Sequence, residues 1–75
     1  MKLRGEVTRK VLYPGTKSEH EGFVFITAEG EFKLRRQGGN PFHDETLDQL
    51  EGKEIEGEGI LRGSQFIMSV WKILQ

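Results

Sequence analysis

Hydrophobic and polar residues alternate along most of this chain with the two-residue period of a β-strand. The N-terminal stretch is the plainest case, because Leu3, Gly5 and Val7 alternate with charged or polar residues. Such alternation predicts strands with one buried and one exposed face. Glycines separate the apolar runs, as they do where tight turns join strands. The pattern predicts five strands, over residues 2–12, 23–28, 31–36, 53–61 and 65–74.

One segment between the third and fourth predicted strands has a helical pattern instead. Asp44 is a favourable N-cap residue, and Leu47 and Leu50 lie three residues apart, which places them on one face of a helix. Phe42 precedes the cap, where it is placed to pack against that face, and Gly52 is placed to end the helix. We therefore predict one short helix over residues 44–50.

The predicted order is three strands, one helix and two strands, within a single domain spanning residues 1–75. This order resembles that of the OB-fold, a five-stranded Greek-key barrel with one helix between its third and fourth strands. Gly5, in the interior of the first strand, fits the bend or bulge that such a barrel needs there. The resemblance implies a mostly β, OB-like barrel, and SH3-like and other small open barrels are the alternatives.

Composition narrows the class of protein. Seventy-five residues are enough for one domain, and the absence of cysteine excludes disulfides and thiolate metal sites. No apolar run in the sequence reaches the length of a membrane-spanning helix, and the first residues do not resemble a signal peptide. We therefore expect a small, soluble protein of the cytoplasm.

Charge is distributed unevenly along the chain. The first 36 residues contain eight Lys or Arg and five Asp or Glu, whereas the rest contain three and seven. In an OB-like barrel the first strand lies beside the fourth. Lys2 and Arg4 would then face three glutamates of the fourth strand, Glu54, Glu56 and Glu58. The asymmetry is explained either by these cross-strand ion pairs or by a basic binding face.

The second predicted strand is apolar on both faces, so alternation alone does not say which side is buried. If Val24 and Ile26 face the core, then Phe23 and Phe25 stand on the outer face of the barrel. In the alternative, Phe23 and Phe25 are core residues, as large aromatic side chains more often are in a small domain.

With the aromatic side chains outside, the second, third and fifth strands would form a surface for single-stranded nucleic acid. Bases stack on aromatic rings, and Lys or Arg neutralises the neighbouring phosphates. The resemblance implies the same face, since OB-folds that bind oligonucleotides use it together with the flanking loops. The candidate ligand-binding residues are Tyr13, Lys17, Phe23, Phe25, Lys33, Arg35, Arg36 and Trp71.

The alternative function is protein–protein interaction or homodimerisation, through the same apolar patch or an unpaired sheet edge. Either a monomer or a weak homodimer fits the sequence. No pattern indicates catalysis, a cofactor or a metal site: His20 and His43 lack metal-ligand spacing, and Ser18 lacks a nucleophile motif. We therefore expect a non-catalytic binding module.

Overall fold

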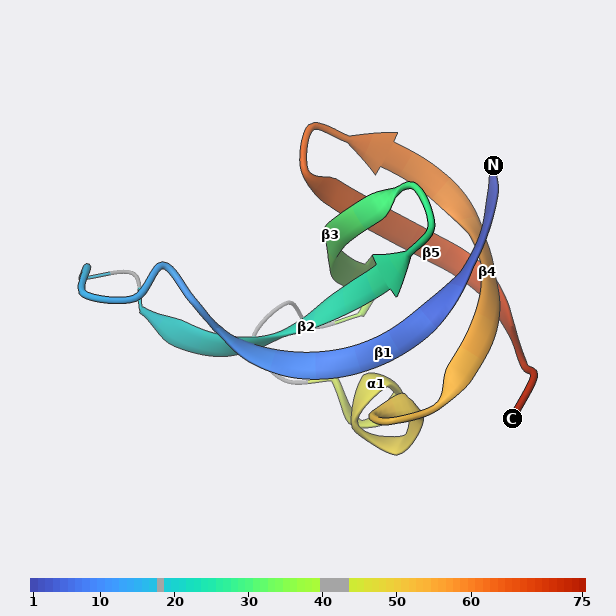
Figure 1. The fold of residues 1–75 in the computed structure, drawn as a ribbon, viewed down its shortest axis with the longest axis horizontal. Helices are drawn as coiled ribbons and strands as arrows, with labels where there is room; N and C mark the ends of the chain where they lie inside the picture. The colour runs from blue at the N-terminus through green and yellow to red at the C-terminus, as the bar shows by residue number, and fades with distance from the viewer. Residues whose placement is uncertain (18, 40–43) are drawn as a thin grey trace.

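The computed structural model describes residues 1–17, 19–39 and 44–75, and these form five strands and one short helix (Figure 1). The mostly β class and the position of the helix between the third and fourth strands are confirmed. The predicted packing of Phe42 falls outside the described residues. The elements are β1 (Lys2–Leu12), β2 (His20–Thr27), β3 (Gly30–Arg36), α1 (Glu45–Leu50), β4 (Glu54–Arg62) and β5 (Gln65–Ile73).

The strands close into a barrel in the order β1-β2-β3-β5-β4, with β4 pairing again with β1. All neighbouring pairs are antiparallel except β3 and β5, which are parallel. The first half of β1 pairs with β4, and its second half pairs with β2 alone. This leaves the far end of the β1–β2 hairpin projecting from one side of the barrel (Figure 1).

Gly5 lies where β1 passes from one partner to the other, since it pairs with both β2 and β4. A Cβ atom at this position would lie 2.1 Å from the carbonyl oxygen of Ile26 in β2. The glycine is therefore required for the close approach of two backbones. The register shift that the structure does contain lies elsewhere, between Glu58 and Gly59 of β4.

The barrel interior is filled by side chains from all six elements. Phe25 and Phe66 stack at its centre, with ring centroids 5.7 Å apart and an interplanar angle of 28°. Phe23, Phe32 and Trp71 are partly exposed and pack against this core. The buried cluster consists of Leu3, Val7, Phe25, Leu34, Leu47, Leu50, Ile55, Phe66 and Met68.

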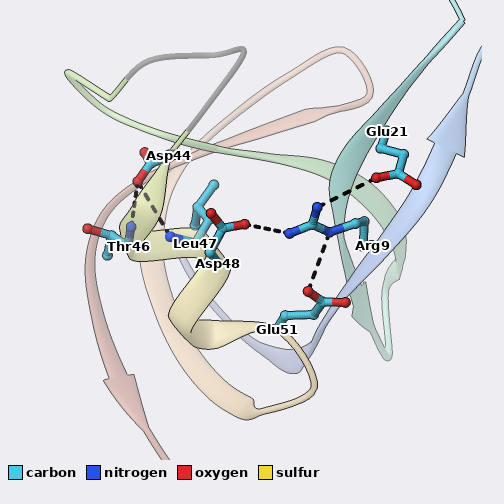
Figure 2. Close-up of polar contacts among 7 residues, drawn as sticks. All are labelled: Arg9, Glu21, Asp44, Thr46, Leu47, Asp48 and Glu51. Atoms are coloured by element: carbon cyan, nitrogen blue, oxygen red, sulfur yellow. Dashed lines mark hydrogen bonds and ion pairs between the residues drawn. The ribbon is translucent and has the colours of Figure 1, made fainter.

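Helix α1 is capped as its sequence predicts. The Asp44 carboxylate accepts hydrogen bonds from the backbone N–H groups of Thr46 and Leu47, at 3.0 and 3.4 Å (Figure 2). Leu47 and Leu50 are each 3% exposed and pack into the core, and Gly52 follows the helix with φ of +80°. No helix in the described part of the chain is long and apolar enough to span a membrane.

Arg9 of β1 joins α1 to the β1–β2 hairpin, a role that the sequence did not predict (Figure 2). Its guanidinium lies 2.5 Å from Asp48 of α1, 3.4 Å from Glu51 at the C-cap of the helix, and 3.6 Å from Glu21 of β2. It also lies 5.0 Å from the centroid of the Phe23 ring. Desolvation lowers the pKa of Arg9, but the three carboxylates more than offset this and raise the pKa, so the side chain stays cationic.

The outward sides of β1 and β4 carry two of the three cross-strand pairs expected from the sequence, whereas Glu54 is opposite Glu6. Lys2 is opposite Glu58 and Arg4 is opposite Glu56, and Arg4 Nε donates a hydrogen bond to Glu56 Oε2 at 2.9 Å. Cross-strand pairing therefore accounts for part of the uneven charge along the chain.

Stability should fall at acidic pH because of this pairing. The hydrogen bond from Arg4, with the positive charges of Arg4, Lys2 and Lys72, holds the pKa of Glu56 below its ordinary value. A carboxyl group with a lower pKa in the folded state stabilises that state above its unfolded pKa of about 4.3. This contribution is lost as the pH falls through the folded pKa. Thermal melts across this range should show the loss, and Arg4→Gln should reduce it. A pH dependence that Arg4→Gln leaves unchanged would contradict this assignment.

Candidate nucleic-acid interface

The predicted ligand-binding residues lie in separate parts of the structure. Phe25 is in the core, and Phe23 lies next to Arg9. Arg36 lies beside the cap of α1, and Trp71 lies beside Arg36. The remaining four are on the outer side of the barrel or in the loop after β1: Tyr13, Lys17, Lys33 and Arg35.

The expectation that Phe25 stands on the outer face is wrong, and the alternative that it belongs to the core is correct. Its side chain is 0% exposed. Its register partners are Val7 of β1 and Phe32 of β3, of which Val7 is fully buried and Phe32 packs against the core. Because paired residues share a face of the sheet, the clear alternation of β1 fixes which side of β2 is buried.

Phe23 lies two residues from Phe25 and so shares its inward face. It is partly exposed, and the guanidinium of Arg9 lies over its ring. This cation–π contact lies next to the ion pairs that Arg9 makes with α1. Phe23 therefore supports the attachment of the helix.

Arg36 and Trp71 likewise belong to the helix end of the barrel. Arg36 Nε donates to the Asp44 carboxylate at 3.0 Å, and the guanidinium lies 5.9 Å from the centroid of the Trp71 ring. Trp71 packs against the core cluster. Arg36 also follows Arg35 directly, so the two side chains point to opposite faces of β3.

Three polar side chains lie in one row on the outer face of β3, β5 and β4. Lys33 alternates with buried Leu34 and therefore points outward. It is opposite Gln65 of β5, which is in turn opposite Arg62 of β4. We call these three residues, Lys33, Gln65 and Arg62, the polar row.

A second row runs beside the first, two residues further along each strand. Arg35 of β3 is opposite Ile67 of β5, which is opposite Ile60 of β4. Arg35 is exposed, Ile60 is 56% exposed and Ile67 is partly exposed. We call these three residues, Arg35, Ile67 and Ile60, the mixed row, and the two rows together the outer face.

The outer face contains three cationic side chains, Lys33, Arg35 and Arg62, and no carboxylate. Across the described ranges, none of the three takes part in an ion pair. Within the same ranges Lys2, Lys17, Lys53 and Lys72 also lack an ion pair, whereas Arg4, Arg9, Lys10 and Arg36 each pair with a carboxylate. The outer face therefore carries three positive charges with apolar side chains beside them, and Glu31 and Glu58 lie next to it on β3 and β4.

Tyr13 adjoins the outer face at β3. The Lys33 ammonium lies 4.1 Å from the centroid of the Tyr13 ring, and Tyr13 is 45% exposed with a left-handed backbone (φ +53°). Lys17 is exposed in the loop after Tyr13. Of the predicted residues, the structure thus brings Tyr13 and Lys33 together, with Arg35 two residues from Lys33 on the same strand.

The outer side of β2 is less accessible than the sequence suggested. Val24 points away from Phe25 but is only 4% exposed. Lys33 of β3 lies opposite Val24 in register. In addition, Lys10 of β1 forms an ion pair with Glu31 of β3, and this pair crosses over β2, which lies between the two strands. We attribute the burial of Val24 to these side chains. The candidate surface is therefore displaced from β2 toward β4.

Sequence reasoning missed Arg62, Ile60 and Ile67 as surface partners of Lys33 and Arg35. Arg62 directly follows the predicted fourth strand, residues 53–61, whereas β4 extends through it. Continuing the alternation of β4 by one residue would have placed Arg62 on the same face as Ile60. Its position in the row of Lys33, however, depends on the parallel β3–β5 pairing, which no local pattern indicates.

Comparison of the sequence with protein-family models and with curated proteins, and of the structure with solved structures, found no match. Within the described ranges, no group of three or more His, Asp or Glu side chains is arranged to hold a metal ion. His43 and Ser18 lie outside those ranges. The chemistry that the outer face offers is the binding of an anionic ligand with apolar parts.

Proposed function

We propose that the protein is a non-catalytic module that binds single-stranded nucleic acid on the outer face. The observation that carries this proposal is the set of outward cations, Lys33, Arg35 and Arg62, that lack ion pairs in the described structure and lie beside exposed isoleucines. Such cations neutralise phosphates, and apolar and aromatic side chains support bases that have left a duplex. The sequence favours a cytoplasmic location for this activity.

The strand order supports the proposal. A closed β1-β2-β3-β5-β4 sheet with one helix between β3 and β4 resembles the OB-fold. Members of that fold bind oligonucleotides and oligosaccharides on the second and third strands and the loops beside them. Here the loop after β1 carries Tyr13 and Lys17, while the turn between β4 and β5 is only Gly63 and Ser64. The short turn favours an open surface over a clamp, and we expect weak binding.

A double substitution tests the proposal. Lys33→Gln with Arg62→Gln removes two cations from the outer face, and each phosphate contact contributes about 0.7 to the salt dependence of single-strand binding. The slope of log K against log salt should therefore fall by about 1.4. Affinity at low salt should fall at least tenfold. Fluorescence anisotropy of a labelled 12-nucleotide single strand measures both quantities.

The matched control is Lys2→Gln with Lys53→Gln, which changes the net charge equally at exposed positions outside the outer face. This control should bind nearly as well as the wild type. Equal losses in the two double variants would mean that only net charge matters. Absence of oligonucleotide binding at low salt would eliminate the proposal.

The second candidate function is association with another protein chain, including a second copy of this one. It is favoured by exposed apolar side chains on β4 and β5: Ile60, Val70 and Ile73 are 56%, 59% and 52% exposed. Exposed apolar surface of this kind marks interaction sites in many proteins. A mass that rises with concentration in light scattering, together with indifference to oligonucleotides, would favour this function.

A further inference from the structure

The two rows of the outer face differ in chemistry. The polar row has a cation at each end, Lys33 on β3 and Arg62 on β4, separated by two inter-strand steps or about 10 Å. The mixed row has two isoleucines and a single cation, Arg35. The rows are two residues apart along each strand, or about 6.6 Å.

For a single strand that crosses β3, β5 and β4, as the proposed function implies, this difference favours one orientation. Its phosphates would lie over the polar row, because the row's two ends are cationic and its centre is the polar Gln65. Its bases would then lie over Ile67 and Ile60, which provide the apolar surface. The reverse orientation would place phosphates on isoleucine side chains and bases between cations, which is less favourable.

In this orientation Arg35 meets the edge of a base. Its guanidinium is exposed, has no ion pair with any described residue, and has no carboxylate in either row to compete for it. A guanidinium forms two parallel hydrogen bonds with O6 and N7 of guanine, and single strands leave these atoms accessible. We infer that the outer face prefers single strands that contain guanine, and that Arg35 recognises this base. The inference rests on the proposed function.

Four five-nucleotide DNA strands test it, each with thymine at the outer four positions and a different base at the centre. The wild type should bind the guanine strand about fivefold more tightly than the other three, or better. Arg35→Lys keeps the charge but not the planar pair of donors, so it should weaken the guanine preference and keep the salt slope. Arg62→Lys, the matched control on the polar row, should retain the preference.

The possible failures are distinguishable by fluorescence anisotropy. Equal binding of all four strands by the wild type would overturn the guanine preference while leaving the proposed function in place. A preference that Arg35→Lys leaves undiminished would overturn the assignment to Arg35. Binding of none of the strands, nor of the 12-nucleotide strand, would overturn both the inference and the proposed function.

Discussion

Replacing Phe25 with alanine is expected to remove a large part of the protein's folding free energy. Phe25 is fully buried, stacks on Phe66 and is opposite Val7. Deleting a buried phenylalanine ring costs about 3–5 kcal/mol, because the surrounding side chains fill the cavity only partly. At about 0.05–0.15 kcal/mol per residue, a domain of this length has roughly 4–11 kcal/mol in total. The variant should therefore be marginally folded or unfolded.

Urea denaturation followed by the fluorescence of Trp71 measures this effect, since Trp71 is the single tryptophan and packs against the core. The matched control is Ile26→Ala, at the next residue, whose side chain points away from the core and is 36% exposed. The control should lose no more than about 1 kcal/mol. A Phe25→Ala protein that is as stable as the wild type but binds oligonucleotides more weakly would contradict the burial of Phe25 and indicate that its ring is exposed.

Replacing Gly5 with alanine is expected to be about as damaging, although it adds only one methyl group. The added Cβ would lie 2.1 Å from the carbonyl oxygen of Ile26 and 2.8 Å from its carbonyl carbon. These are backbone atoms of a paired strand, so relief requires β1 and β2 to separate where β1 also pairs with β4. We expect a loss of about 3 kcal/mol or more, at the upper end of the range for overpacked sites.

Two other glycines give graded controls for Gly5→Ala. A Cβ at Gly57 would lie 2.6 Å from Met68 Sδ, in a flexible side chain that can shift, so Gly57→Ala should have an intermediate effect. A Cβ at Gly63 would meet nothing within 4 Å, and its φ of +60° alone should cost about 1–2 kcal/mol. Equal losses at Gly5 and Gly63 in urea denaturation would show that steric overlap is not the cause.

The sequence predicted the parts of the fold that depend on near neighbours. The alternation in residues 2–12 gave β1 with its observed bounds, and the N-cap residue Asp44 with Leu47 and Leu50 gave α1. The second strand begins three residues earlier than predicted, at His20, because the long second half of β1 pairs with it. Pairing with β1 therefore extends β2 over residues 20–22, whose own sequence does not predict a strand.

The candidate site was predicted less well, for reasons that are also physical. Four consecutive apolar residues in β2 carry no two-residue period, so the inward position of Phe25 follows only from its pairing with Val7. The nearness of Lys33 and Arg62 requires both the β3–β5 and the β4–β5 registers. The sequence therefore allowed Lys33 and Arg35 to be proposed as binding residues, but it did not predict that they share a surface with β4.

The parallel pairing of β3 with β5 has a consequence for how the chain folds. The three-strand meander from β1 to β3 and the β4–β5 hairpin each join segments that are adjacent along the chain, whereas Lys33 and Gln65 are separated by 32 positions. Contacts between distant segments form slowly, because the intervening chain must lose its freedom before they form. We expect the two antiparallel units to form early and their docking, at the β3–β5 and β1–β4 seams, to limit the folding rate.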